Sequence, residues 1–161
     1  HNRGVGFSLE PGHPAEYGPG RQPPHTLAPA LVTRPDGSLH TVLGTMGGDS
    51  QPQIVLQLLA RVLAAGESIG RAVRAPRWVL ASGTGQGFDT WTAGEPIVRV
   101  EADAPAAWVE GLRRRGHEVT VASELDVAGF GHAHGITIDE DGTRIGEADP
   151  RAIVGAAIAT A

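Results

Sequence analysis

The chain has 161 residues, a formal net charge of −5 and 40% hydrophobic residues, and it holds no cysteine and no lysine. This length is typical of one domain, and the apolar share excludes a disordered chain. The absence of cysteine excludes a disulfide framework, a thiolate metal site and a cysteine nucleophile. The absence of lysine excludes Schiff-base chemistry and lysine-containing phosphate loops, and the negative balance makes nucleic acid a poor partner.

Nothing in the sequence predicts membrane insertion, because no apolar run reaches the roughly 18 residues that a spanning helix needs. The first residues lack the basic and apolar runs of a signal peptide, and both a cytoplasmic and an exported location stay open. Residue 1 is His1 rather than methionine, so we expect the chain to begin inside a longer protein. Residues 95–150 carry twelve scattered acids against five arginines, a pattern typical of a solvated face.

The first half of the chain predicts an irregular start followed by a hairpin and a helix. Residues 1–29 hold eleven Gly or Pro, which indicates an ordered irregular segment with a short strand at 5–9. Two strands, 28–34 and 39–44, are separated by a Pro-Asp-Gly-Ser turn and predict a β-hairpin. After a glycine turn at 44–50, apolar residues at helical spacing predict a helix that Asp49 or Ser50 caps and that ends at Gly66.

The second half predicts short elements of both kinds, in this order: a helix at 69–75 capped by Ser68, strands at 78–80 and 96–100 around a glycine-rich loop at 83–94, a helix at 104–115 capped by Asp103, a strand at 118–121, a hairpin at 135–147 and a buried strand at 152–159. This mixture predicts an α/β or α+β sandwich with largely antiparallel pairing.

Gly47 and Gly48, between the second strand and the first long helix, form the sharpest local motif. Adjacent glycines let backbone N–H groups approach a ligand, and the start of the following helix adds a positive dipole end. The turn could therefore hold an oxyanion or a phosphate, or it could be a plain tight turn. No Gly-Lys-Ser/Thr follows, so it is not a phosphate loop of the nucleotide-binding type.

Four other groups of residues point to ordinary structural roles. His132 and His134 fall on one side of a strand near Asp139, but a metal site needs a third ligand in place, and we expect no metal. His25, Thr26 and His40 could support a hydroxyl nucleophile, yet no nucleophile-elbow motif accompanies them. The three arginines at 113–115 suit the C-terminal end of a helix. The tryptophans at 78, 91 and 108 are expected to pack or to anchor loops.

Six segments together resemble the C-terminal part of the small subunit of the gamma-glutamyltranspeptidase family: 2–14 (NRGVGFSLEPGHP), 24–30 (PHTLAPA), 44–53 (GTMGGDSQPQ), 72–78 (AVRAPRW), 115–119 (RGHEV) and 148–151 (ADPR). The resemblance covers essentially the whole chain. It implies an α+β fold of the N-terminal-nucleophile hydrolase type, a four-layer αββα sandwich, present here as an incomplete single domain over residues 1–161. It also implies a precursor that cleaves itself to free a nucleophilic threonine, which would lie upstream of this chain.

The resemblance also implies roles for particular residues. Gly47 and Gly48 match the oxyanion pair of the family, and Thr26 matches one of two hydroxyl residues that bind the α-carboxylate of the substrate. The other hydroxyl is replaced by His25. The group that usually receives the substrate's α-amino group falls at Arg3, and a nearby aspartate falls at Gly6. Because Arg3 would repel an ammonium, we expect a glutaryl-like or other carboxylated acyl group.

Two functions follow from the sequence. The first is a fragment of an amidohydrolase or acyltransferase that forms an acyl-enzyme and uses no cofactor. Its partners would be the large subunit, the N-terminal part of the small subunit and a small amide substrate. The second is a non-catalytic binding or structural module with an anion-binding turn. As an isolated piece, the chain is expected to lack amidase activity and to associate with itself.

Overall fold

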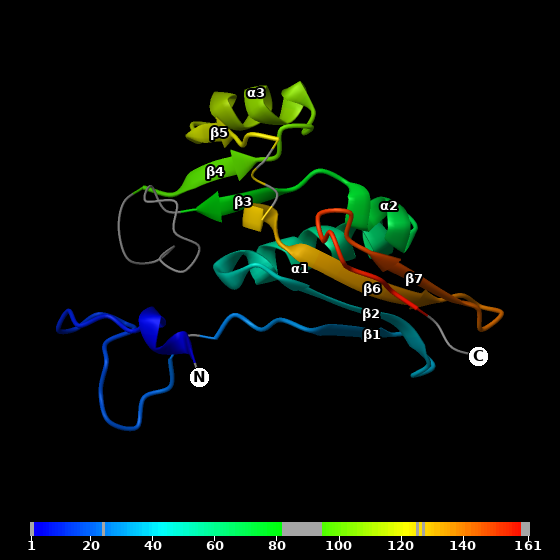
Figure 1. Ribbon diagram of the computed structural model, residues 1–161, viewed down its shortest axis with the longest axis horizontal. Coiled ribbons are helices and arrows are strands. Elements are labelled where there is room, and N and C mark those ends of the chain that lie inside the picture. Colours follow the sequence, from blue (N-terminus) through cyan, green and yellow to red (C-terminus); the bar gives the residue numbers. More distant parts are fainter. Residues whose placement is uncertain (1, 24, 82–94, 125, 127, 159–161) are drawn as a thin grey trace.

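The computed structural model describes residues 2–23, 25–81, 95–124, 126 and 128–158. Figure 1 shows helices packed on one face of a long sheet, with a smaller sheet and a helix beside them. The glycine-rich loop predicted at 83–94, which includes Trp91, lies outside the described residues. Along the described part, short runs of strands and of helices follow one another without an internal repeat.

The larger sheet has four antiparallel strands in the order β1-β2-β6-β7, with the bounds β1 Ala30–Thr33, β2 Leu39–Met46, β6 His132–Ile138 and β7 Arg144–Ala148. Both predicted hairpins are confirmed, because β1 pairs with β2 and β6 pairs with β7. The two hairpins join where β2 pairs with β6, so that Leu43 lies opposite Gly135. The pairing of β2 with β6, which lie about 90 residues apart in the sequence, thus unites the two hairpins in one sheet.

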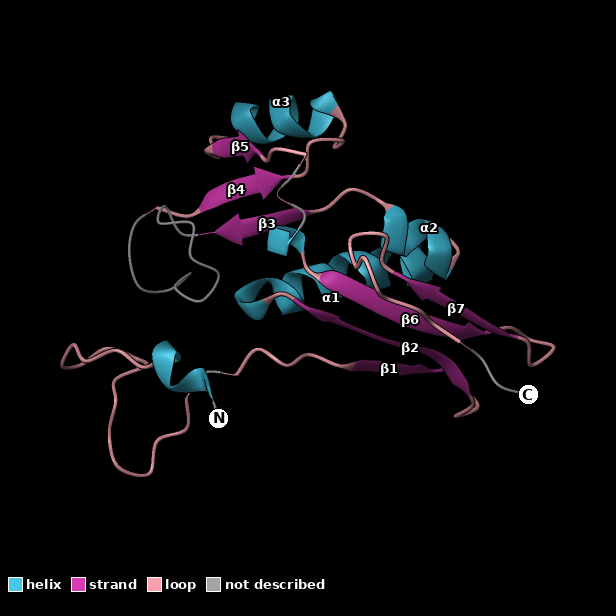
Figure 2. Ribbon diagram, in the orientation of Figure 1, coloured by secondary structure: helices cyan, strands magenta, loops and turns pink. Residues whose placement is uncertain are grey.

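Two helices, α1 (Gln51–Leu59) and α2 (Ile69–Arg74), cover one face of this sheet (Figure 2). The run begins with the 3-10 turn η2 (Gly48–Ser50) and continues beyond α1 as the π-helical segment η3 (Ala60–Ala64). Ser68 caps α2 as predicted, accepting the Arg71 N–H at 3.4 Å. The buried residues between helices and sheet form the main core: Leu43, Ile54, Val55, Leu58, Val62, Ile69, Ala72, Val73, Val79, Phe130 and Ala133.

The opposite face of the four-stranded sheet carries apolar side chains that stay accessible. Leu31, Val42 and Met46 alternate with the helix-facing residues and are 66%, 40% and 54% exposed. The C-terminal segment crosses part of this face, because a Cβ placed on Gly146 would lie 3.1 Å from the Cβ of Ala157. The chain therefore supplies a helix layer on a sheet layer, half of the expected four-layer arrangement, and its α+β class is confirmed.

The buried strand predicted at 152–159 is wrong. Ile153 and Val154 are 98% and 96% exposed, and the described residues of this segment form turns and coil. Asp149 explains the change of direction, since its carboxylate accepts the Arg151 N–H at 3.0 Å and its carbonyl accepts the Ala152 N–H at 2.9 Å. This turn bends the chain away from the line of β7.

The smaller sheet contains β3 (Trp78–Ala81), β4 (Ile97–Val100) and β5 (Val119–Val121). β3 and β4 are antiparallel, whereas β4 and β5 are parallel and are connected through α3 (Ala106–Arg114). The predicted Asp103 cap is wrong: Pro105 occupies the N-cap position of α3, and no side chain caps it. Proline fixes its own φ near the helical value, which starts a helix without a capping side chain.

Two glutamines of α1 attach the free edge of β3 to the helix layer. Gln53 accepts the Leu80 N–H at 2.7 Å and donates to the Leu80 carbonyl at 3.3 Å. Gln57 accepts the Trp78 N–H at 3.1 Å and donates to the Trp78 carbonyl at 2.8 Å. Four helical residues advance about 6 Å and two strand residues about 6.8 Å, so the two spacings match. The two carboxamides thus make the hydrogen bonds that a neighbouring strand would otherwise make to this edge of β3.

A buried ion network joins the two sheets at the N-terminal end of β3, where Arg77 precedes Trp78. Arg77 and Asp149 form an ion pair at 2.7 Å, with side chains 2% and 0% exposed. Arg151 contacts both oxygens of Glu101 at 2.5 Å and Asp149 at 3.0 Å. Arg77 and Arg151 also donate to backbone carbonyls, and both reach that of Val73. The network thereby holds together the start of β3, the end of β4 and the segment that follows β7.

The N-terminal segment is irregular, as predicted, but its strand at 5–9 is wrong. Residues Asn2–Gly6 form the 3-10 turn η1, and the Phe7 N–H donates to the Gly4 carbonyl at 3.2 Å. Glycines interrupt any alternation of apolar residues here, so a local turn forms instead of a strand. The rings of Phe7 and Tyr17 meet edge to face, with centroids 5.5 Å apart, which closes the loop between them.

Candidate functional site

The glycine pair forms a sharp turn between β2 and η2. Gly47 has φ 144° and Gly48 has φ 56°, both in the region that favours glycine. A Cβ at Gly47 would lie 2.6 Å from Ser50 Oγ. The hydroxyl and the backbone N–H of Ser50 both donate to the Gly47 carbonyl, at 2.6 and 3.1 Å. These contacts turn the chain from strand to helix within two residues.

The same turn opens a helical run, since η2 leads directly into α1. N–H groups in the first turn of a helix have no intrahelical acceptor, and they lie at the positive end of the helix dipole. Such donors stabilise an oxygen that gains negative charge during a reaction. The geometry of Gly47 and Gly48 is therefore compatible with the oxyanion role expected from the sequence.

Gly131, which the sequence analysis missed, supports the turn from behind. It lies directly before β6 and has φ 72°. A Cβ at this position would lie 2.3 Å from the Met46 carbonyl oxygen and 2.7 Å from Ile54 Cδ1. Only glycine permits β6 to approach the end of β2 so closely. The one signal in the sequence is a glycine directly before a predicted strand, which is too common to identify this contact.

Arg3 and Thr26, both expected to bind substrate, lie together in the structure. Arg3 Nη1 donates to Thr26 Oγ1 at 2.6 Å, and the two residues are each 7% exposed. They are 23 residues apart in the sequence, and the irregular N-terminal segment brings them into contact. A guanidinium beside a hydroxyl is suited to bind a carboxylate, because both groups can donate hydrogen bonds to it.

His25 does not share this environment. It is exposed, and its Nδ1 accepts the Leu27 N–H at 3.1 Å. Of the two adjacent residues at the positions of the family's hydroxyl pair, the matching Thr26 is buried with Arg3, and the replacement His25 is not. A direct contact of His25 with a bound acyl group stays a prediction. Gly6, where the family has an aspartate, is buried and adds no charge.

Gln51, also missed from the sequence, connects the Arg3–Thr26 pair with the glycine turn. It is the first residue of α1 and is 6% exposed. With its carboxamide nitrogen facing two carbonyls, it donates to Thr26 O at 3.0 Å and to Thr45 O at 3.1 Å. A polar residue at the start of an amphipathic helix suggests a cap, and nothing local indicates its long-range partner.

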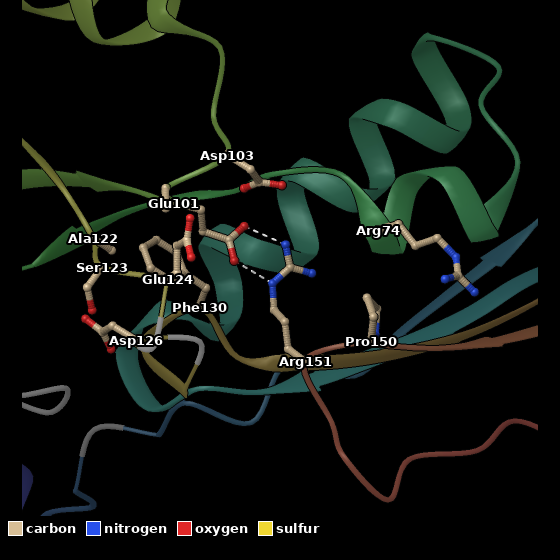
Figure 3. Close-up of a pocket in the computed structure, with 11 residues that line it drawn as sticks. Arg74, Glu101, Asp103, Ala122, Ser123, Glu124, Asp126, Phe130, Pro150 and Arg151 are labelled. Atoms are coloured by element: carbon tan, nitrogen blue, oxygen red, sulfur yellow. Dashed lines mark hydrogen bonds and ion pairs between the residues drawn. The ribbon is translucent and has the colours of Figure 1, made fainter.

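A cavity of about 390 Å³ lies elsewhere, at the ion network. Figure 3 shows Glu101 and Arg151 facing each other in its wall, with the carboxylates of Asp103, Glu124 and Asp126 nearby. Asp126 is paired with Arg99, whose guanidinium also lies 5.7 Å from the centroid of the Phe130 ring. None of the five predicted site residues contributes to this wall. Of its charged groups, Glu101 and Arg151 form the ion pair that joins the two sheets.

His132 and His134 are half-buried on the accessible face of the large sheet, opposite Met46 and Gly44 of β2. Asp139 follows the C-terminal end of β6, whereas the two histidines lie at its N-terminal end, so the strand pairing does not bring Asp139 beside them. Within the described ranges, no group of three or more His, Asp or Glu is arranged to hold a metal ion. Likewise, no described helix is both long and apolar enough to cross a membrane.

The chain is similar in sequence to a known protein family and to several known proteins. The family model described as Gamma-glutamyltranspeptidase matches residues 1–159. The oxamate amidohydrolase proenzyme of Klebsiella pneumoniae subsp. pneumoniae is 37% identical over 150 residues, and the glutathione hydrolase-like YwrD proenzyme of Bacillus subtilis is 35% identical over 150 residues. Each alignment covers 93% of this chain but 27% of the relative.

A solved structure agrees with these relatives. The cephalosporin acylase from Bacillus halodurans has a TM-score of 0.75 at 32% identity, and the match covers 93% of this chain and 25% of that chain. The chain thus spans about a quarter of the length of the relatives it matches. The segments that carry Arg3, Thr26, Gly47 and Gly48 all lie inside the matched family region.

Proposed function

Because the chain belongs to the gamma-glutamyltranspeptidase family, we propose that it is the C-terminal part of an amidohydrolase or acyltransferase that acts through an acyl-enzyme. The observation that carries the proposal is the buried cluster of Arg3, Thr26 and Gln51 beside the glycine turn. It combines a cation and a hydroxyl that suit a carboxylate with backbone donors that suit an oxyanion. The chain is one incomplete domain of this enzyme.

The reaction divides between this chain and the rest of the precursor. The nucleophile is the hydroxyl of an N-terminal threonine freed by self-cleavage upstream, and its own α-amino group takes the proton. Attack on the amide carbonyl gives a tetrahedral oxyanion, to which the Gly47 and Gly48 N–H groups donate. Collapse expels the amine and leaves an acyl-enzyme. Water or a second amine then attacks this ester and releases the acyl group.

The acyl group is a carboxylated one that lacks an α-ammonium. The buried Arg3 guanidinium attracts a carboxylate and repels an ammonium at the position where the family usually places an acidic or amide group. The name of the Klebsiella relative supports this proposal, since oxamate is an amide that carries a carboxylate and no ammonium. The B. subtilis relative is named glutathione hydrolase-like, which makes gamma-glutamyl amides the competing substrate class.

The partner of the accessible sheet face is the rest of the same precursor. The chain matches about a quarter of the length of each curated relative, so most of the enzyme lies outside it. Leu31, Val42 and Met46 form an apolar surface on this face. A second sheet from the large subunit and the N-terminal part of the small subunit would bury that surface and complete the four-layer sandwich.

The experiment compares substrates in the full-length, self-processed protein and in its Arg3→Gln variant. We expect the parent to favour oxamate or a glutaryl anilide over a gamma-glutamyl anilide. Loss of a charged hydrogen-bond donor costs about 1.5 to 3 kcal/mol, so Arg3→Gln should lower kcat/KM for the carboxylated amides roughly 10- to 100-fold. Arg21→Gln is the matched control, because Arg21 is exposed in the same segment and donates only to a backbone carbonyl.

Two results would contradict the proposal. The carboxylate role of Arg3 would be wrong if the parent enzyme prefers gamma-glutamyl anilide and if kcat/KM of Arg3→Gln for the carboxylated amides stays within two-fold of the parent value. A processed protein that turns over no amide of either class would favour the non-catalytic module.

A further inference from the structure

Gln51 occupies an unusual place for a polar side chain. It lies three residues after Gly48, it is 6% exposed, and its neighbours Ile54 and Val55 on α1 belong to the apolar core. A buried carboxamide costs free energy unless its polar atoms are satisfied. Its partners therefore indicate why glutamine is present at this position.

Those partners belong to two separate segments. Both neighbouring groups are carbonyl acceptors, which assigns the carboxamide nitrogen to that side; in this orientation it donates to the Thr26 carbonyl at 3.0 Å and to the Thr45 carbonyl at 3.1 Å. Thr26 carries the hydroxyl that accepts the hydrogen bond from Arg3. Thr45 is the last residue but one of β2 and lies two residues before Gly47. One NH₂ group has two hydrogens, so a single side chain fixes both carbonyls at once. No shorter or apolar side chain could satisfy them in the same way.

We propose that Gln51 is a positioning residue that sets the distance between the carboxylate-binding pair, Arg3 and Thr26, and the oxyanion turn at Gly47 and Gly48. This inference rests on the proposed function of those four residues. A small amide must place its carboxylate at one group and its carbonyl oxygen at the other simultaneously. A displacement of about 1 Å between the two groups can cost on the order of 100-fold in rate.

Gln57 separates positioning from simple stabilisation. It lies on the same helix, its carboxamide also joins two segments, and it makes hydrogen bonds of 2.8 to 3.1 Å to Trp78. Outside its own helix its partner is Trp78 of β3, a strand that carries none of the proposed site residues. Gln51→Met and Gln57→Met therefore remove comparable hydrogen bonds with nearly the same change in side-chain shape, and only the first affects the site.

The experiment uses the full-length, self-processed protein with a glutaryl anilide as substrate. We expect Gln51→Met to lower kcat about 10- to 100-fold with a smaller change in KM, because each half of the site still binds while their alignment is lost. Gln57→Met should keep kcat within two-fold although its melting temperature falls. In a double-mutant cycle, Arg3→Gln should cost less in the Gln51→Met background than in the parent, since the two groups act as a unit.

Hydrogen exchange provides a readout that needs no turnover. Gln51→Met should accelerate exchange in peptides covering 25–28 and 44–50 together, and Gln57→Met should leave both unchanged. Unchanged exchange in both peptides, or kcat within two-fold of an active parent, would overturn the inference. If the parent turns over no amide, the proposed function fails, and the exchange result alone decides whether Gln51 couples the two segments.

Discussion

At the scale of single residues, buried charge is the most demanding feature of this molecule. Arg77 and Asp149 are almost fully buried, and each makes further hydrogen bonds, which such a pair needs to offset desolvation. Burial alone would raise the pKa of Asp149. The Ala133 N–H, the Arg77 charge and the contacts from Arg151 outweigh burial, and they hold the pKa of Asp149 below its ordinary value.

This lowered pKa predicts a pH dependence of stability. The contribution of Asp149 is fully present above the ordinary carboxyl pKa of about 3.9, and it is lost as the pH falls from there through the lower folded value. Urea unfolding between pH 6 and pH 3 should show a steeper loss for the parent than for Asp149→Asn. The variant should also lose about 3 to 5 kcal/mol at neutral pH, because it leaves Arg77 buried without its counter-charge.

The comparison isolates Asp149 from the other carboxyl groups. Hydrogen bonds from Ser38 and Thr143 lower the pKa of the exposed Asp36 and Asp141, but these groups are unchanged in the variant. Parallel pH profiles for the two proteins would contradict the role assigned to Asp149.

At the scale of elements, the two glutamines that attach β3 to α1 make a separate prediction. Gln57→Met removes hydrogen bonds to both backbone groups of Trp78 and should cost about 1 to 3 kcal/mol in the free energy of unfolding. Exchange of the β3 amides should accelerate as well. Gln22→Met, at an exposed glutamine of the N-terminal segment, is the control. A loss no larger than that of the control would show that β3 does not depend on α1.

Elements with strong local signals were predicted from sequence, and elements decided by distant contacts were not. The hairpin at β1 and β2 has a turn motif, and α2 has a capping serine, so both were located correctly. The segment at 152–159 is as apolar as a strand, yet the turn at Asp149 redirects it. At the site, the glycine turn has a local signature, whereas Gln51 and Gly131 acquire their roles only through contacts with remote backbone.

At the scale of the whole molecule, the accessible sheet face predicts how an isolated 161-residue chain behaves. Without the rest of the precursor, Leu31, Val42 and Met46 stay exposed, and the chain should associate with itself and bind a hydrophobic dye. Leu31→Lys should weaken this association. Leu56→Lys should not, because Leu56 is similarly exposed but lies on α1, away from that face. A strictly monomeric chain at high concentration, with no dye binding, would contradict the prediction.

The central claim is that the turn at Gly47 and Gly48 stabilises the oxyanion of the complete enzyme, and turnover of Gly48→Ala tests it most directly. Gly48 has φ 56°, so alanine should cost only about 1 to 2 kcal/mol in stability. Alanine keeps the backbone N–H, but its Cβ would strain the turn and crowd the approaching substrate, which misaligns the donor with the oxyanion. A donor that no longer reaches the oxyanion should cost roughly 100- to 1,000-fold in turnover. Met46→Leu, a near-isosteric change beside the turn, should do little. In the self-processed full-length protein, we expect Gly48→Ala to cause a large fall in turnover with a small fall in melting temperature. Turnover of Gly48→Ala within about two-fold of the parent would contradict the oxyanion role.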